Sequence, residues 1–335
     1  MTAAELAFPI LVALIVVAVL FDLLNGLHDA ANSIATMVST RAMSPLWAVV
    51  WAAFFNFVAF LFFGVHVATT VGSGLVHPDV INSHVVFGAL MGAIAWNLIT
   101  WNLGIPSSSS HALIGGLVGA GVAKGGFGAI AWAGLNITAA AIVGSPLLGF
   151  ILAPALILVV SWVFIRQTPF AVDRWFRRLQ FVSASLYSLG HGGNDAQKTM
   201  GIIWMLLIFA GLSGARETLP FWVVIACQAA MGLGTLLGGW RIIKTMGSRI
   251  TRLTPMQGFC AQTGGAMTLF LATHFGIPVS TTHTIAGSIV GVGVARRVSA
   301  VRWNIASGIV VAWVITLPAS GAIAALGYWI ARLLW

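Results

Sequence analysis

Acidic residues are scarce in this chain, and charged residues of either sign are few. Of 335 residues, 7% are charged, whereas a soluble domain usually carries about a quarter. Hydrophobic residues make up 59% of the chain, so its folded surface cannot be polar throughout. This composition excludes a water-soluble protein and predicts an all-α polytopic membrane protein. The seven acidic residues are Glu5, Asp22, Asp29, Asp79, Asp173, Asp195 and Glu217.

The shortage of acid also explains much of the formal net charge of +9. Basic residues of a membrane protein usually mark its cytoplasmic loops, so nucleic-acid binding is not expected. Cys227 and Cys260 lie in apolar runs without a CxxC pair, which predicts neither a disulfide framework nor a zinc site. We therefore expect no cofactor and no tightly bound metal. Acidic runs of the DDxxD kind are also lacking, which argues against an enzyme acting on phosphorylated lipids.

Two motifs recur in the same order in the two halves of the chain. The stretch GIPSSSSHALIGGLVGAGVAK, from Gly104, aligns without a gap with GIPVSTTHTIAGSIVGVGVAR, from Gly276. Upstream, GLHDAANS from Gly26 pairs with GGNDAQKT from Gly192. Proline, histidine and aspartate match as well as the apolar positions, so chance similarity between two glycine-rich helices is a poor explanation. An internal duplication is predicted.

No long polar segment separates domains. The longest charged stretch is RQTPFAVDRWFRR at 166–178. At the N-terminus, Glu5 stands where a signal peptide would carry positive charge, so the first apolar segment is interpreted as a retained span. We expect an N-terminal repeat at 1–165, a basic cytoplasmic linker at 166–178 and a C-terminal repeat at 179–335.

Each half offers five apolar segments long enough to cross a bilayer, which takes about 17–25 residues. About 10–12 membrane segments are therefore expected. The first segment of each half carries a glycine-rich polar motif, which predicts a helix broken or unwound at depth. The third and fourth segments could form a re-entrant hairpin. The segments are 7–25, 46–72, 84–103, 105–123 and 127–165, and then 181–211, 220–240, 258–275, 278–295 and 303–335.

The distribution of Lys and Arg predicts the orientation. If the loop at Arg41 is cytoplasmic and the spans alternate, most basic residues fall inside, as the positive-inside rule requires. Both termini then lie outside, and each half crosses an odd number of times, so the second copy is inverted. Inverted repeats are typical of secondary transporters. The inner residues are Arg41, Arg166, Arg174, Arg177, Arg178, Arg241, Lys244, Arg249, Arg252, Arg296, Arg297 and Arg302, and the outer ones are Lys124, Arg216 and Arg332.

Acidic side chains occur where a membrane span should be apolar. An Asp at the centre of a span costs about 2.5–3.5 kcal/mol. Lys198 follows Asp195 by three residues, so the two share a helix face and are predicted to pair. Carboxylate and carboxamide oxygens suit a hard cation such as Na⁺, or carry protons; a purely structural ion pair is the alternative. The coupling-ion candidates are Asp29, Asp195, Asn25, Asp22, Ser33, Gln197 and Thr199, in the company of His28, Asn32, His191 and Asn194.

The second motif predicts an anion site. In GIPSSSSH and GIPVSTTH, Gly-x-Pro ends one helix, proline suits the first turn of the next, and hydroxyls follow in that turn. Free N–H groups and the positive end of the helix dipole attract an anion there. Two such starts, related by the inverted repeat, could enclose a tetrahedral oxyanion, whereas hydroxyls that merely cap a helix are the alternative. The candidate anion ligands are Ser107, Ser108, Ser109, Ser110, Ser280, Thr281 and Thr282, with Lys198 as the fixed positive charge.

Histidines end both hydroxyl runs. His111 and His283 occupy matching positions. Each could donate a hydrogen bond to the anion, shuttle a proton, or simply pack on a helix face.

At this point the chain resembles the PiT family of inorganic phosphate transporters. GLHDAANS and GGNDAQKT are similar to the family's duplicated signature, and NSIATMVSTRAM and SLGHGGNDAQK look closest to its bacterial low-affinity branch. The resemblance covers nearly the whole chain and implies inverted halves, outward termini, the cell inner membrane and a homodimer in membrane lipid. It implies that Asp29 and Asp195 serve the coupling ion and the substrate, with Asn32, Asn194 and the hydroxyl runs lining the site.

Two departures bear on the coupling ion. His28 replaces the Asn common in sodium-coupled members of the family, and Asn56 stands where many of those carry Glu. Both resemble the proton-coupled branch, whose substrate is taken to be a neutral metal–phosphate complex. We expect a secondary transporter, not an enzyme, that imports inorganic phosphate by cation symport, with protons favoured over sodium. A sulfate permease of the same family, a sodium-coupled phosphate symporter and a non-transporting receptor are the alternatives.

Overall fold

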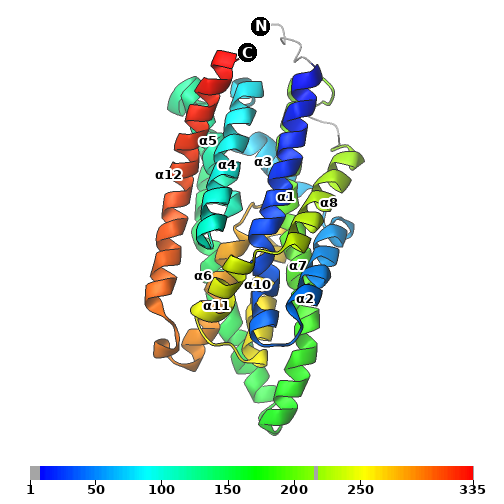
Figure 1. Cartoon of the computed structure of the whole chain (residues 1–335), viewed down its shortest axis with the longest axis vertical. Coiled ribbons are helices and arrows are strands. Elements are labelled where there is room, and N and C mark those ends of the chain that lie inside the picture. The colour runs from blue at the N-terminus through cyan, green and yellow to red at the C-terminus, as the bar shows by residue number, and fades with distance from the viewer. Residues whose placement is uncertain (1–7, 215–217, 335) are drawn as a thin grey trace.

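A computed structural model describes residues 8–214 and 218–334 and shows a bundle of helices (Figure 1). Within these ranges, β structure is limited to one bridge between Val76 and Ile130. The α-helices are α1 (Phe8–Ser39), α2 (Pro45–Phe57), α3 (His66–Gly74), α4 (Ser83–Leu103), α5 (Ser109–Gly125), α6 (Trp132–Val163), α7 (Pro169–Phe209), α8 (Phe221–Leu237), α9 (Trp240–Lys244), α10 (Pro255–His274), α11 (Thr281–Arg296) and α12 (Trp303–Leu334). Short helical turns are η1 (Val58–Leu61), η2 (Pro78–Val80), η3 (Gly126–Ala129), η4 (Thr245–Arg249) and η5 (Val298–Ala300).

The same series of elements occurs twice. A long helix comes first, as α1 and then α7, and a bent pair of helices follows. The bend is 83° between Pro45–Leu61 and His66–Gly72, and 64° between Phe221–Leu237 and Trp240–Arg249. A helical hairpin and a second long helix complete each series, as α4, α5 and α6 and as α10, α11 and α12.

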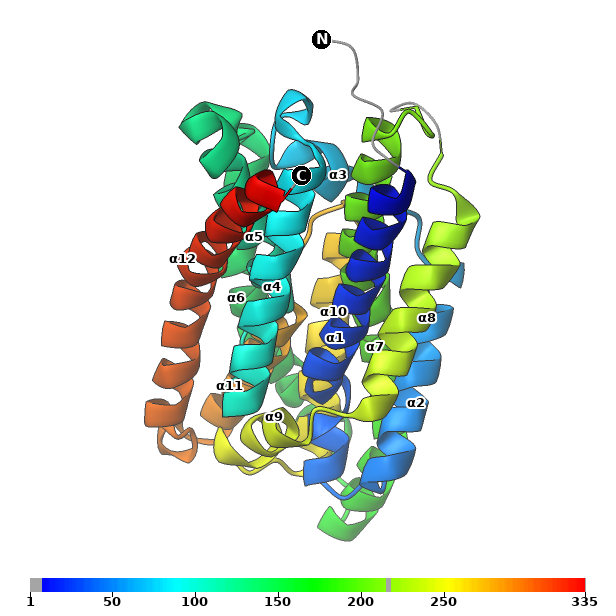
Figure 2. The same ribbon diagram turned by 45° about the horizontal axis from the view of Figure 1, so that its top comes forward.

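The two series are inverted relative to each other. Helix α1 begins and helix α12 ends at one end of the bundle, here the terminus end, whereas α6 and α7 meet at the opposite linker end (Figures 1 and 2). The hairpin of α4 and α5 enters from the terminus end, and the hairpin of α10 and α11 enters from the linker end. The tips of the two hairpins therefore meet inside the bundle.

The first span of each series is continuous, which corrects our expectation of a helix broken at its motif. The helix α1 runs unbroken through Gly26, and α7 runs unbroken through Gly192. The glycines serve close packing instead: a Cβ atom on Gly26 would lie 2.3 Å from the Met231 carbonyl oxygen, and one on Gly192 would lie 2.4 Å from that of Asn56. The break occurs in the second span, where α2 with η1 gives way to α3 and α8 gives way to α9.

The last span of each series is also one helix, although it contains proline. Pro146 and Pro154 lie inside α6, and Pro318 lies inside α12. These helices are exchanged between the halves: α6 packs against α10 and α11, and α12 packs against α4 and α5. This exchange ties each hairpin to the other half of the chain.

The chain is an integral membrane protein. Among the described residues, five helices (α1, α4, α5 with η3, α6 and α12) are long and apolar enough to cross a bilayer, and the two bent pairs raise this number to seven. The helix α7 is less apolar because it carries a polar motif, and the motif residues from Leu189 to Leu207 are all buried in the bundle. Lys124 and Arg332 lie at the terminus end, where α5 and α12 finish. Arg216 lies outside the described residues.

Candidate functional site: two acids between two helix starts

The hairpin tips owe their shape to matching glycines. Gly104 and Gly276 both have φ of 67°, a left-handed conformation that glycine adopts without strain. Beyond them the chain turns back on the preceding helix: the Ile105 N–H donates to the Thr100 carbonyl at 2.9 Å, and the Ile277 N–H donates to the Ala272 carbonyl at 2.8 Å. These bonds end α4 and α10 in the same way.

Each returning helix begins at a serine cap. The Ser108 hydroxyl accepts the His111 N–H at 3.2 Å, and the Ser280 hydroxyl accepts the His283 N–H at 3.1 Å. The helices therefore start at Ser109 and Thr281, which corrects the expectation that proline occupies the first turn. The hydroxyl oxygens of these two caps accept backbone N–H groups. The hydroxyls of the next two residues in each helix reach the acids instead.

Two buried carboxylates lie between the helix starts and bind both of them. Ser109 and Thr282 donate to Asp29, at 2.5 and 3.0 Å. Thr281 and Ser110 donate to Asp195, at 2.9 and 3.4 Å. Each acid thus receives one hydroxyl from its own half and one from the other half. This crossed pattern places the pseudo-twofold axis of the repeat between Asp29 and Asp195.

The site departs from this symmetry one helical turn beyond each acid. Asn32 donates to Thr282 at 2.9 Å and to Thr281 at 3.3 Å. Lys198, at the equivalent position of α7, forms a salt bridge with Asp195, as its spacing predicts. The lysine also donates to the Ser110 hydroxyl at 2.5 Å and to the Val279 carbonyl at 2.7 Å. The site therefore holds two carboxylates and one buried ammonium group.

The residues that precede the acids brace the hairpin tips. His28 contacts Asp29 through Nδ1 at 3.0 Å and the Thr100 hydroxyl through Nε2 at 3.1 Å. The Ser107 hydroxyl, 3.5 Å from the His28 ring, donates to Thr100 at 2.9 Å. Asn194 donates to the Thr273 hydroxyl at 3.0 Å and accepts from the Val279 N–H at 3.3 Å. Asn194 and Ser107 thus support the two tips.

His191 extends the acid pair toward the linker end. Its Nε2 lies 3.3 Å from Asp195 Oδ2, and its Nδ1 contacts Asn56 Oδ1 at 3.2 Å and the Ser33 hydroxyl at 3.4 Å. One ligand atom each from Asp29, His191 and Asp195 lie within 4.8 Å of one another, a grouping that could hold a metal ion. This grouping combines two carboxylates with one imidazole nitrogen.

Four predicted coupling-ion ligands lie away from the acid pair. Gln197 accepts the Val67 N–H at 2.9 Å and so caps the start of α3, beyond the break in the second span. Asp22, Asn25 and Thr199 form a separate buried group on α1 and α7, with Asn25 and Thr199 beside the Asp22 carboxylate.

The two histidines that end the hydroxyl runs contact each other. The rings of His111 and His283 meet edge to face, with centroids 4.2 Å apart, and His283 stacks on Trp313 at 3.7 Å. Of the three interpretations left open by the sequence, this aromatic cluster favours packing.

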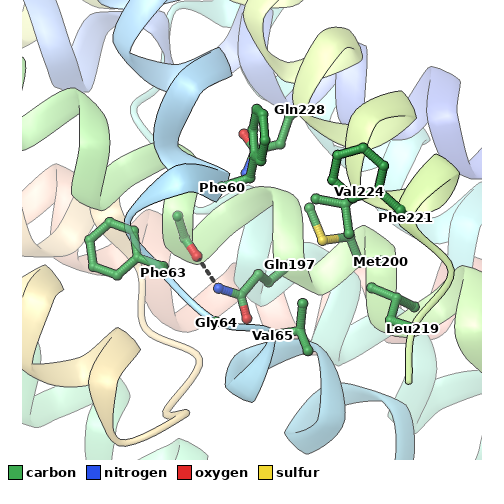
Figure 3. A pocket seen from close by; sticks show the side chains of 11 residues that line it. Phe60, Phe63, Gly64, Val65, Gln197, Met200, Leu219, Phe221, Val224 and Gln228 are labelled. Carbon is green, nitrogen blue, oxygen red and sulfur yellow. Dashed lines mark hydrogen bonds between the residues drawn. The ribbon is translucent and has the colours of Figure 1, made fainter. Parts of the chain in front are cut away.

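A cavity of about 250 Å³ lies beside α7, between the bent pair of the first half and α8 (Figure 3). Gln197 and Gln228 point into it among apolar side chains. Gln197 also donates to the Gly193 carbonyl at 2.6 Å, the contact drawn in Figure 3. Its lining includes neither Asp29 nor Asp195. Both acids are buried.

Comparison with known proteins agrees with this geometry. The model of the phosphate transporter family matches residues 25–324, which include both acids and both helix starts. The chain belongs to this family.

Relatives across the phosphate transporter family match nearly end to end. A "Probable low-affinity inorganic phosphate transporter" of Rhizobium meliloti (strain 1021) is 70% identical over 98% of this chain and 99% of its own. A protein of the same description from Bacillus subtilis (strain 168) is 46% identical over 97% and 98%. A solved structure titled "The sodium-dependent phosphate transporter" is 25% identical, with a TM-score of 0.90 over 98% of this chain and all of the other. Fold and relatives are those of a transporter, not an enzyme.

The sequence alone did not point to three residues that contact the site of this phosphate transporter family member. Thr100 and Thr273 receive hydrogen bonds at the hairpin tips, and the Tyr187 hydroxyl donates to the Thr281 carbonyl at 2.8 Å. The threonines carried no signal because they end ordinary apolar helices. Tyr187 did carry one, since it is one of two tyrosines in the chain and stands just before the second acidic motif.

Proposed function

We propose that the chain imports inorganic phosphate by symport with protons. The observation that supports this function best is the crossed pairing of Asp29 and Asp195 with the hydroxyls of two inverted helix starts. Serine and threonine hydroxyls that donate to a carboxylate can donate equally to a phosphate oxygen. Helix N-termini add backbone N–H groups and a favourable dipole for a second anion at the same place.

The charge of the site explains why phosphate must travel with cations. Asp29, Asp195 and Lys198 together carry a formal charge of −1 when both acids are ionised, all at 2% exposure or less. Adding a phosphate dianion without compensation would bury a charge of −3, and buried unpaired charge is strongly unfavourable. Protons or metal ions that enter with the anion remove this penalty. Each net positive charge carried inward also gains about 2.3 kcal/mol per 100 mV of membrane potential.

Two side chains favour protons over sodium. His28 places a ring nitrogen against Asp29, where a carboxamide would offer an oxygen ligand for Na⁺. The Asn56 amide is occupied by Thr235, to which it donates at 2.9 Å, and by His191. A histidine beside a carboxylate is a proton-binding pair, whereas Na⁺ prefers oxygen ligands.

A neutral metal–phosphate complex is a second form of cargo, favoured by the grouping of Asp29, His191 and Asp195. Phosphate bound at the helix starts would draw Lys198 toward itself and release Asp195 for the metal. If the complex is carried, phosphate uptake should require Mg²⁺ or Mn²⁺, and labelled Mn²⁺ should enter together with phosphate.

Uptake into proteoliposomes tests the coupling. An inward pH gradient should drive accumulation of labelled phosphate, and an inward Na⁺ gradient at constant pH should not. A strict sodium requirement would overturn proton coupling and leave a sodium-coupled symporter.

Competition by excess sulfate tests which anion is transported. Sulfate is fully deprotonated near neutral pH and cannot donate to Asp29 or Asp195, so phosphate uptake should persist.

The setting of the protein completes the proposal. We place it in the cell inner membrane as a homodimer surrounded by lipid, with both termini outside and the linker end in the cytoplasm. No resident cofactor is needed, because the chemistry consists of binding and release. Cross-linking of the purified protein in nanodiscs would reveal the dimer.

A further inference from the structure

A second buried polar group lies on α1 and α7, displaced from the acid pair toward the terminus end. Asp22 precedes Asp29 by seven residues, which is two helical turns or about 10 Å along α1. Thr199 follows Asp195 by four residues, one turn along α7. Because α1 and α7 run in opposite directions, both displacements point the same way. Asn25 stands one turn from Asp22 on the same face of α1.

The oxygens of this group lack partners. Within the part of the chain the structure describes, both carboxylate oxygens of Asp22, the amide oxygen of Asn25 and the hydroxyl of Thr199 make no hydrogen bond of ordinary length and angle, although Asn25 and Thr199 lie beside the carboxylate. Asp22 and Thr199 are 0% exposed and Asn25 is 2% exposed, so water does not satisfy them. An ionised carboxylate in such a place is very costly.

The equivalent place in the other half is built differently. A shift of 166 residues, the offset of the motif, turns Asp22 into Ser188, Asn25 into His191 and Thr199 into Ser33. There, the His191 ring contacts Ser33 and the amide of Asn56. The residue equivalent to Asp22 is a serine, although the Asp195 carboxylate lies 3.3 Å from the His191 ring. Asp22 therefore has no acidic counterpart in the other half.

Among residues 8–214 and 218–334, the positive group that acts on Asp22 is Lys198, and it is already bound elsewhere. Of the helices packed against α1, α7 brings Asp195 and Lys198 toward it and α8 brings the Cys227 thiol. The ammonium group of Lys198 is bound by Asp195, Ser110 and the Val279 carbonyl. The ionisable side chain of α4 is His84, which lies against Tyr328.

One proton fits this group better than a metal ion. A protonated Asp22 becomes neutral and gains an O–H donor, for which the Asn25 amide oxygen is an acceptor, while Thr199 can donate to the other carboxyl oxygen. A hard cation such as Ca²⁺ takes about six or more oxygen ligands, more than these three side chains offer. We infer that Asp22, supported by Asn25 and Thr199, is a proton-carrying site separate from the phosphate-facing acids. This inference rests on the proposed proton symport.

The test separates proton coupling from phosphate binding. Purified wild-type protein and the Asp22→Asn variant are reconstituted into liposomes, and two quantities are measured: accumulation of labelled phosphate under an imposed pH gradient, and exchange of labelled for unlabelled phosphate without a gradient. In the variant, accumulation should fall to the equilibrium level while exchange stays within about threefold of wild type. Ser188→Ala, at the equivalent position of the other half, is the matched control and should keep both.

Each other outcome has a defined meaning. Gradient-driven accumulation by Asp22→Asn at the wild-type level would overturn the inference and leave proton symport intact. Loss of exchange as well would overturn the separation of the two sites. A wild-type protein that does not respond to the pH gradient would refute the proposed function itself.

If Asp22→Asn is not recovered from membranes, the Asn25→Ala variant provides the test. Without its acceptor, protonated Asp22 is less stable, so the pH of half-maximal uptake should fall. An unchanged pH profile would refute the site.

Discussion

Asp29 and Asp195 combine a structural and a functional task at the scale of single residues. Each carboxylate accepts hydroxyls from both hairpin helices, so the pair joins the two halves at the tips of their hairpins. If phosphate takes over these hydroxyls, as the proposed function requires, the acids lose partners, and we expect them to gain protons or a metal ion. Binding of anion and cation would then be linked through shared hydrogen bonds.

Neutralising either acid should abolish uptake. Asp29→Asn and Asp195→Asn each replace two charge-assisted hydrogen bonds, worth about 1.5 kcal/mol apiece, and a loss of about 3 kcal/mol corresponds to about a hundredfold. Labelled phosphate uptake by cells that lack other phosphate transporters measures this, with membrane abundance followed by immunoblot. Asp173→Asn is the matched control, because Asp173 is 44% exposed and pairs with Arg177 at the surface. Wild-type uptake by both acid variants would refute the site.

Removing the buried ammonium group should damage stability and affinity together. Lys198→Gln leaves Asp195 without its counter-charge, and breaking a buried pair costs about 3–5 kcal/mol. We expect a KM for phosphate raised at least tenfold and a lowered unfolding temperature in detergent. The double variant Asp195→Asn with Lys198→Gln should recover part of the thermal stability but not transport. If the destabilisation of the double variant equals the sum of those of Lys198→Gln and Asp195→Asn alone, the pair is not coupled.

The sequence alone predicted which residues lie at the site. It predicted the role of each residue less well. Apolar surroundings made Asp29, Asp195 and Lys198 conspicuous, and the hydroxyl runs were visible as repeats. Which of these residues caps a helix and which contacts the acids depends on the tertiary structure. Ser108 and Ser280 cap helices, Gln197 caps α3 and Asn194 holds a hairpin tip. These polar residues look alike in sequence because the partner that occupies each one comes from a distant segment.

At the scale of elements, glycine determines how closely α1 and α7 approach their neighbours. Gly26 lets α1 lie against the backbone of α8, and Gly192 lets α7 lie against α2. A glycine inside an apolar helix suggests a break when only the sequence is considered. The backbone of a neighbouring helix, which the sequence does not reveal, explains why each glycine is needed although its helix remains continuous. For the same reason, the sequence alone did not predict the breaks in the second spans.

A methyl group at Gly26 should therefore be poorly tolerated. In Gly26→Ala the new Cβ would lie 2.3 Å from the Met231 carbonyl oxygen, which forces α1 and α8 apart. Overpacking of this kind costs about 1–3 kcal/mol, so the unfolding temperature in detergent should fall and uptake should weaken. Gly144→Ala in α6 is the matched control, because nothing lies within 4 Å of its added Cβ. A Gly26→Ala protein as stable as the control would show that the helices do not pack this closely.

At the scale of the whole molecule, the exchange of α6 and α12 links the two hairpins mechanically. Each hairpin packs against the long helix of the other half, and the hairpin tips share the acid pair. We expect movement of one hairpin with its exchanged helix to alter access from one end only. The inverted arrangement supplies an equivalent unit for the other end, which is the geometry that alternating access requires. The distribution of Lys and Arg predicted this inversion correctly. It indicated an odd number of membrane crossings in each half, and that number does not depend on where the helices bend.

The orientation of the molecule can be tested with its own cysteines left in place. Cys227 and Cys260 are both buried, so a membrane-impermeant maleimide should not label the wild-type protein. Phe127→Cys introduces a thiol at a site 72% exposed near the terminus end, and Thr168→Cys introduces one at the linker end. We expect labelling of Phe127→Cys in intact cells and of Thr168→Cys only after permeabilisation, because the basic linker should face the cytoplasm. The reverse pattern would invert the assigned orientation, and labelling of both from one side would contradict the single crossing of α6 that separates these two positions.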